Sequence, residues 1–128
     1  MAAGFPYSTG DVLTATDMNG LVAFTTTTQT ADYTPVLADQ YQTLVILNKA
    51  TAINFSIPTN ASVAYPVGTV ITVLNIGAGT ATIKAVTSGT TTVLSAGATA
   101  AQPTLAQYKS AACIKTATDT WYVVGAIA

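Results

Sequence analysis

The chain has 128 residues, of which 50% are hydrophobic and only 7% are charged, whereas an average soluble domain carries about 25% charged residues. All five acidic residues are Asp, all four basic residues are Lys and the net charge is −1, so Glu, Arg and His are absent. The length favours one domain; four scattered lysines exclude the basic face of a nucleic-acid-binding protein, and the lack of His removes the usual metal ligand and general base.

Residues 1–22 differ from the rest and are expected to form an N-terminal arm. The first ten residues combine Gly, Pro and Ser with the aromatic residues Phe5 and Tyr7, a composition that does not build a core. Residues 13–20 place Thr and Asp early and end in Asn-Gly, which predicts a short helix. Its apolar contacts are Leu13, Met18, Leu21 and Val22. The arm either closes one end of the domain as a lid or docks on a neighbour or a larger assembly. In the second case the expected contact residues are Phe5, Tyr7, Leu13, Met18 and Leu21.

From residue 23 onward the pattern is one of strands and turns, favoured by the many Thr and Val residues. A Thr-rich strand is expected at 23–28. The continuous apolar run at 43–48 predicts a strand covered on both faces. Residues 52–58 alternate, with Ile53, Phe55 and Ile57 on one side, which indicates a half-buried strand.

The second half of the chain continues the same pattern. A strongly apolar strand is expected at 69–75, and Gly77-Ala78-Gly79 predicts a turn to a hairpin partner at 80–86. A strand at 91–94 and a final hairpin of 111–115 with 121–124 follow. About eight short antiparallel strands without a clear internal repeat predict an all-β fold, a jelly-roll-like β-sandwich over residues 23–128.

Little in the chain supports catalysis. Cys113 lies between apolar residues and has no His partner, which predicts a packed core thiol. Lys109 and Ser110 are adjacent in a strand, so their side chains face opposite ways. The acidic residues all fall in arm, turn or loop positions where Asp is a common capping residue: Asp11, Asp17, Asp32, Asp39 and Asp119. We therefore expect that the protein is not an enzyme and has no cofactor or metal site. The rival hypothesis is a glycan hydrolase, which needs two carboxylates about 5–10 Å apart in a cleft.

The mean hydropathy of +0.49 is high for a small monomer, which must keep a wet exterior. We interpret the surplus apolar surface as an interface between subunits. No apolar stretch reaches the roughly 20 residues of a membrane helix, and the first residues lack the Lys or Arg of a secretory signal.

The aromatic residues Tyr65, Trp121 and Tyr122 are candidates for the subunit interface, because Tyr and Trp often anchor such contacts. Trp121 and Tyr122 are adjacent in a strand, so their side chains point to opposite faces. In the alternative interpretation one of them points into the core and the other points at a neighbouring subunit. Exposed rings of this kind also stack on sugars.

Several segments resemble a module that recurs in tailed-phage structural proteins. The most distinctive is the closing Lys115–Tyr122 (KTATDTWY). Together the segments span most of the chain: Gly10–Asn19 (GDVLTATDMN), Leu44–Asn48 (LVILN), Phe55–Pro58 (FSIP), Val63–Thr69 (VAYPVGT), Asn75–Gly79 (NIGAG), Gln107–Ala111 (QYKSA) and Ile114–Gly125 (IKTATDTWYVVG).

The resemblance implies a virion protein with a trimeric β-sandwich. Tail fibres carry a long shaft and an attachment domain, whereas only about 22 residues precede the sandwich here, so a capsid decoration (cement) protein fits better. Such a protein would be assembled in the bacterial cytoplasm and bind the major capsid protein on the outer surface of the head. The alternative is a receptor-binding tip or short tail fibre that recognises host-surface glycans.

Overall fold

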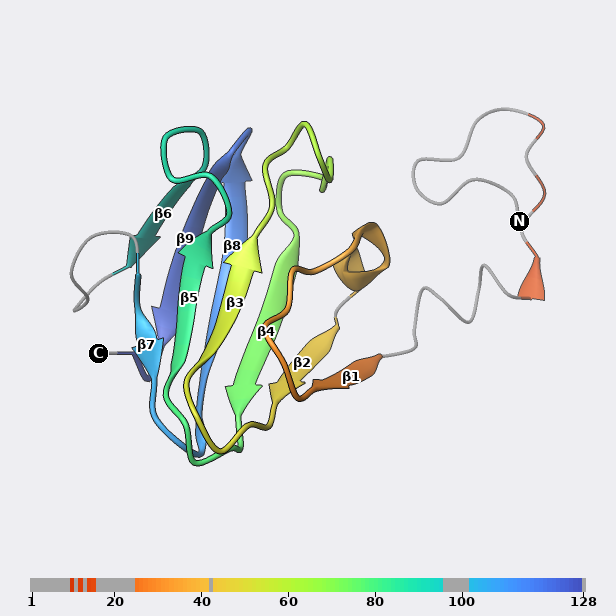
Figure 1. Cartoon of the computed structure of the whole chain (residues 1–128). Coiled ribbons are helices and arrows are strands. Elements are labelled where there is room, and N and C mark those ends of the chain that lie inside the picture. The colour runs from red at the N-terminus through yellow and green to blue at the C-terminus, as the bar shows by residue number, and fades with distance from the viewer. Residues whose placement is uncertain are drawn as a thin grey trace.

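The computed structural model describes residues 10, 12, 14–15, 25–41, 43–95 and 102–127, and these residues are built mainly of β-strands (Figure 1). The prediction of an all-β chain is therefore confirmed. One 3-10 helix, η1 (Leu37–Gln40), lies between the first two strands. The strands are β1 (Thr26–Gln29), β2 (Leu44–Leu47), β3 (Ile53–Ile57), β4 (Val70–Asn75), β5 (Ala81–Ala85), β6 (Thr92–Ser95), β7 (Thr104–Leu105), β8 (Lys109–Ala117) and β9 (Thr120–Gly125).

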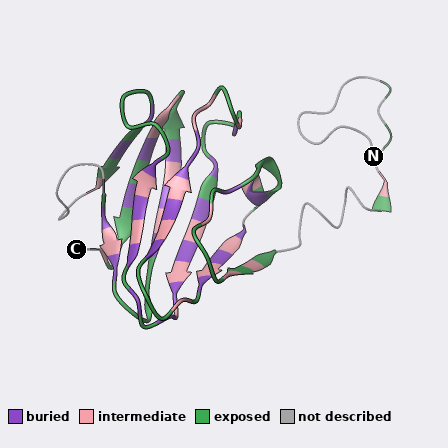
Figure 2. Cartoon of the chain, viewed as in Figure 1, coloured by how far each residue is buried: buried purple, intermediate pink, exposed green. Residues whose placement is uncertain are grey.

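The strands form two sheets that face each other across the core (Figure 1). The larger sheet has the order β1-β2-β4-β8-β9-β6, and the smaller has the order β3-β5-β7. Buried residues alternate along the strands of both sheets, as Figure 2 shows, because successive side chains in a strand point to opposite faces. Ile53, Phe55 and Ile57 all point inward, as their alternation predicted.

The expectation of antiparallel pairing is wrong for much of the molecule. Four strand pairs are parallel (β1–β2, β2–β4, β3–β5 and β6–β9) and three are antiparallel (β4–β8, β5–β7 and β8–β9). After β2 the chain crosses to the smaller sheet as β3, and after β4 it crosses again as β5. Because the chain crosses to the other sheet and back between β2 and β4, and again between β3 and β5, the two strands of each pair run parallel.

These crossings form two stacked β-arches with a constant offset. The register of β4 on β2 and of β5 on β3 is 28 positions in both sheets (44 to 72 and 53 to 81). A partial third layer lies on the β1 side, where Tyr33 forms a parallel bridge with Phe55. The fold thus contains a geometric repeat that the sequence does not display, because the paired positions share burial and only one pair, Val45 and Val73, shares residue identity.

Residues 76–80 are an arch between sheets and not the hairpin turn predicted from Gly77-Ala78-Gly79. A Cβ atom on Gly77 would lie 2.3 Å from the Lys49 backbone N, and one on Gly79 would lie 1.8 Å from the Thr51 backbone O. Both glycines are therefore required by the preceding arch. The buried Asn75 amide fixes the arch by donating to the carbonyls of Gly79 (2.8 Å) and Leu105 (2.9 Å) and accepting from Gly77 N (3.1 Å).

The predicted hairpin near the C-terminus is confirmed, since β8 and β9 pair antiparallel. It places Trp121 and Val123 in the core and turns Tyr122 and Val124 outward. Among the described residues no helix has the length and apolar character that crossing a membrane requires.

Candidate interaction surface

The outer face of the six-stranded sheet, the side turned away from the core, carries apolar side chains mixed with hydroxyl side chains and no charged ones. We call it the open face. Strand register and burial assign to it Thr26 and Thr28 of β1, Leu44 and Ile46 of β2, Val70, Thr72 and Leu74 of β4, Ser110, Ala112 and Ile114 of β8, Thr120, Tyr122 and Val124 of β9, and Thr92 and Leu94 of β6.

One row of apolar side chains crosses four neighbouring strands of the open face. Val70 pairs with Ile114, Ile114 with Tyr122, and Tyr122 with Leu94. Three of these side chains are substantially exposed, at 40% for Val70, 43% for Tyr122 and 40% for Leu94, and Val124 in the next row is 47% exposed. Cross-strand neighbours at this spacing form a continuous surface and not scattered apolar spots.

The open face also changes the interpretation of the run at 43–48. Because every residue of Leu44–Leu47 is apolar, the sequence predicts a strand covered on both faces. In the structure Val45 and Leu47 are fully buried, whereas Leu44 and Ile46 on the open face are only half-buried. The described part of the chain supplies one of the two covers.

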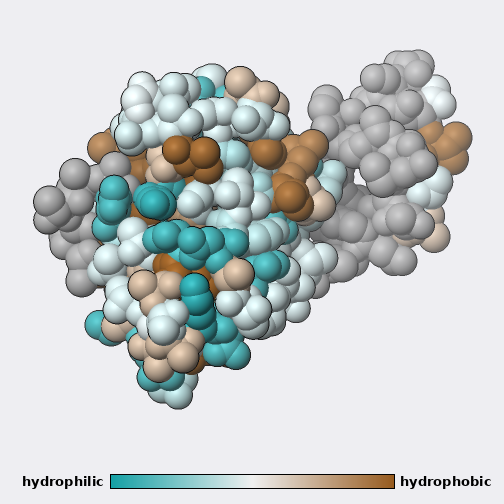
Figure 3. Space-filling view, in the orientation of Figure 1, coloured by the Kyte–Doolittle hydropathy of each residue, from teal (hydrophilic) through white to brown (hydrophobic). Residues whose placement is uncertain are grey.

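The outer face of the three-stranded sheet has the opposite character. Its outward residues are Asn54 and Ser56 of β3, Thr82 and Lys84 of β5, and Thr104 of β7. The Asp32 carboxylate accepts from Asn54 N at 2.9 Å and from Asn54 Nδ2 at 3.3 Å. These hydrogen bonds, the backbone one first, lower the pKa of Asp32. Figure 3 views the molecule from this side, where hydrophilic residues lie across the sheet.

Two of the three predicted interface aromatics are in the wrong place for that role. Tyr65 is 3% exposed and Trp121 is 2% exposed, and their rings meet edge to face with centroids 5.6 Å apart. They belong to the core of one chain because Trp121 shares the inward side of β9 with Val123. Of the three, only Tyr122 lies on the open face. This agrees with the alternative in which one of the two adjacent residues points inward and the other outward.

A buried lysine links the loop at 58–69 to the β8–β9 hairpin. Lys115 is 2% exposed, and its Nζ donates to Asn60 Oδ1 at 2.5 Å and to the Tyr65 carbonyl at 2.7 Å. Asp119, in the hairpin turn, accepts from Asn60 N at 2.6 Å. Burial lowers the pKa of Lys115, and the charge of Asp119 opposes that shift. The alternation of β8 put Lys115 on the inward side, a signal that sequence reasoning missed.

A second polar cluster anchors η1. The Asp39 carboxylate accepts from the Tyr33 hydroxyl at 2.5 Å and from Val36 N at 2.9 Å, and the Tyr65 hydroxyl donates to the Val36 carbonyl at 2.6 Å. Burial and then the bond to Asp39 raise the pKa of Tyr33 to about 12. Burial also raises the pKa of Tyr65.

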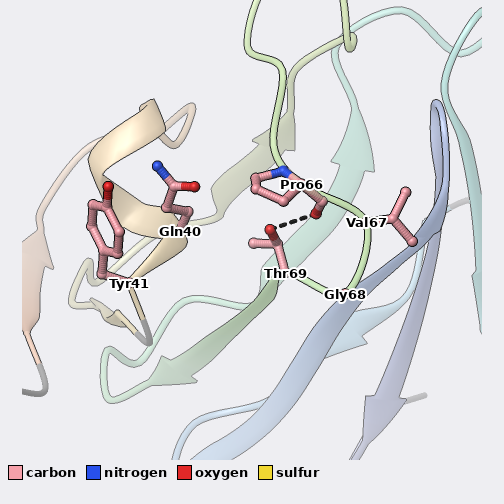
Figure 4. A pocket seen from close by; sticks show the side chains of 6 residues that line it. All are labelled: Gln40, Tyr41, Pro66, Val67, Gly68 and Thr69. Atoms are coloured by element: carbon pink, nitrogen blue, oxygen red, sulfur yellow. Dashed lines mark hydrogen bonds between the residues drawn. The ribbon is translucent and has the colours of Figure 1, made fainter. Parts of the chain in front are cut away.

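Beside this cluster lies a shallow pocket of about 290 Å³ (Figure 4). Gln40 and Tyr41 at the end of η1 face the loop of residues 66–69 across it, and the Thr69 hydroxyl donates to the Pro66 carbonyl at 2.7 Å. No lining residue is charged. Asp39, the nearest acidic group in the sequence, is 7% exposed and is held by Tyr33 and Val36.

The remaining candidate residues are placed as follows. Cys113 is fully buried, and burial raises the pKa of its thiol to about 12, so it is a core thiol as predicted. Within the described ranges no group of three potential metal-ligating side chains comes together. Asp11, Asp17 and the arm residues Phe5, Tyr7, Leu13, Met18 and Leu21 lie outside the described residues.

Comparison of the chain with protein-family models, with curated proteins and with solved structures finds no match. The open face is therefore interpreted from its own chemistry.

Proposed function

We propose that this chain is a non-enzymatic virion structural protein. It acts as a homotrimeric decoration (cement) protein that binds the major capsid protein on the outer surface of a phage head. The proposal includes the classification of the two facing sheets as a β-sandwich. The parallel arches separate this sandwich from a jelly roll, whose strands pair antiparallel.

The observation that carries the proposal is the contrast between the two outer faces. A solitary two-layer β domain exposes polar side chains on both outer faces, since only the inner faces are packed. Here the three-stranded sheet follows that rule with Asn54, Ser56 and Lys84, whereas the open face presents Val70, Leu94 and Tyr122. An assembly of many copies is the setting in which such a face is useful.

Capsid stabilisation would follow from the burial of apolar area, which contributes about 25 cal/mol per Å² removed from water. A modest contact per copy becomes a large effect when many linked copies bind one shell. Because the chain carries few charges, we expect the contacts to be mainly apolar, and screening by moderate salt then weakens them little. We therefore expect the protein to remain on purified particles through a salt wash that leaves the shell intact.

The test is the location and copy number of the protein in intact virions. A decoration protein is present in numbers comparable to the major capsid protein and labels the head surface in electron micrographs. Deletion of residues 1–22 should leave a folded trimer that no longer binds the head. Presence in only a few copies at the tail, or loss from the head in moderate salt, would contradict the proposal.

A receptor-binding tip is the second candidate, favoured by Tyr108. This residue lies in the turn between β7 and β8, is 75% exposed and adopts a left-handed φ of 65°. Its backbone N donates to the Asn75 carbonyl at 2.6 Å, so the loop is held in place while the ring faces solvent. Aromatic rings presented this way stack on sugars. Glycan binding by the isolated protein that is lost in Tyr108→Ala would favour this candidate.

A further inference from the structure

We infer that copies of this chain associate through the open face, so that the outer side of the six-stranded sheet is buried against other copies. The inference rests on the proposed homotrimer and names its contact surface. The occupant is this same chain, and not a membrane, a nucleic acid or a glycan.

The first argument is the missing second cover. Residues Leu44–Leu47 of β2 are apolar at every position, and β4 adds Leu74 and Val70 to the same outer side. Unbroken apolar strands of this kind are found where a sheet is covered on both faces. The three-stranded sheet covers the inner side, and its own outward residues are polar. The open face needs a cover of matching apolar character.

The second argument is charge. No residue assigned to the open face is ionisable at neutral pH, whereas Lys84 and Asp32 lie on the opposite side of the molecule. In a three-fold assembly the same face of each copy lies beside the same face of the other two around the axis, so a face of one charge sign would be repelled. A neutral face is complementary to itself. It gives no attraction to the phosphates of nucleic acid or anionic lipid, which basic side chains recognise.

The third argument is area. Six strands spaced about 4.8 Å apart span roughly 24 Å. The strands have four to nine residues, between five and six on average, and rise about 18 Å, giving a footprint of roughly 430 Å² per chain. A specific interface buries about 1,000 Å² or more in total over both partners. In a trimer each open face is shared between two neighbouring copies, and the three faces together bury roughly 1,300 Å². The assembly therefore reaches the required size only if nearly the whole open face takes part, including the row that runs from Val70 on β4 to Leu94 at the β6 edge of the sheet.

The test introduces one charge on the open face and one on the opposite face. Tyr122→Lys and Val124→Lys each place an ammonium group on β9 at side chains that are 43% and 47% exposed in a single chain, so the fold tolerates the substitution. Thr82→Lys on the central strand of the three-stranded sheet is the matched control, since Thr82 is outward and next to Lys84 in the same face. Circular dichroism confirms folding, and sedimentation equilibrium gives the association state.

We expect the wild type and Thr82→Lys to be trimers, and both β9 variants to dissociate with an apparent Kd raised at least about a hundredfold, because a lysine buried unpaired in an apolar contact is strongly unfavourable. If both β9 variants remain trimers, the inference is wrong while the homotrimer stands. If the wild type itself is monomeric, the trimer and the inference both fail. Should one variant not fold, the other, or Leu94→Lys at 40% exposure, decides the outcome.

Discussion

Substitution of Gly79 by Ala tests the stacked arches directly. The new Cβ would lie 1.8 Å from the backbone O of Thr51 and 2.2 Å from its carbonyl carbon. These are backbone atoms and cannot rotate away, so the arch at 76–80 must move off the arch at 48–52. That movement also disturbs the bond from Gly79 N to the Lys49 carbonyl (2.9 Å) and the bond from Asn75 Nδ2 to the Gly79 carbonyl (2.8 Å).

The expected loss of stability combines two effects. Overpacking of a close contact costs about 1–3 kcal/mol, and a buried amide left without its partner costs a further 1–3 kcal/mol or so. We therefore expect Gly79→Ala to lower the free energy of unfolding by about 2–6 kcal/mol. Gly89→Ala is the control, because a Cβ there meets nothing within 4 Å and should change stability by less than about 0.5 kcal/mol.

Urea unfolding followed by fluorescence is a suitable assay, since the one Trp of the chain, Trp121, is in the core at 2% exposure. Equal midpoints for Gly79→Ala and Gly89→Ala would refute the stacking of the two arches. A normal midpoint for Gly89→Ala with a much lower one for Gly79→Ala supports it.

Three further predictions concern the buried polar and thiol groups. Burial lowers the pKa of Lys115 in the folded state below its ordinary 10.5, so between these two pKa values the unfolded state holds the proton and the folded state does not. The unfolding free energy of the wild type should therefore rise with pH in that range relative to that of Lys115→Met. A difference between the two proteins that does not change with pH would contradict this. The pKa of Tyr33 is raised from 10.0 to about 12 in the folded state, so between these values the folded state keeps the proton and the unfolded state loses it. The wild type should therefore lose stability between pH 10 and 12, and Tyr33→Phe should lose less. The midpoints of urea unfolding at each pH measure the difference. With a pKa of about 12 and full burial, Cys113 should react with a thiol reagent only after unfolding in denaturant, and rapid stoichiometric labelling of the native protein would count against its place in the core.

The positions of the strands could be predicted from alternation, but their partners could not. Ile53, Phe55 and Ile57 gave β3 and its inward side correctly. A hairpin and an arch look alike along the chain, because each consists of two alternating strands joined by a short turn. The feature that distinguishes the arch from a hairpin is the contact of Gly77 and Gly79 with residues 49–51. Those residues lie about 28 positions earlier in the chain, so the local sequence does not reveal the contact.

The existence of the candidate surface could be predicted from the sequence, but only some of its residues could be. The unbroken run Leu44–Leu47 indicated two covered faces, and the described part of the chain covers one of them. Among the aromatics, position in the strand was the useful signal: Trp121 and Tyr122 are neighbours on opposite sides of β9. Tyr65 lies in a loop without alternation, so nothing local indicated that its ring packs on Trp121.

The molar mass of the full chain in solution tests the central claim most directly. Sedimentation equilibrium at micromolar concentration should give three times the 13.0 kDa of one chain, with little dependence on salt. A single species of 13.0 kDa that stays monodisperse and soluble would contradict the account, because the open face would then remain exposed to water in the functional protein.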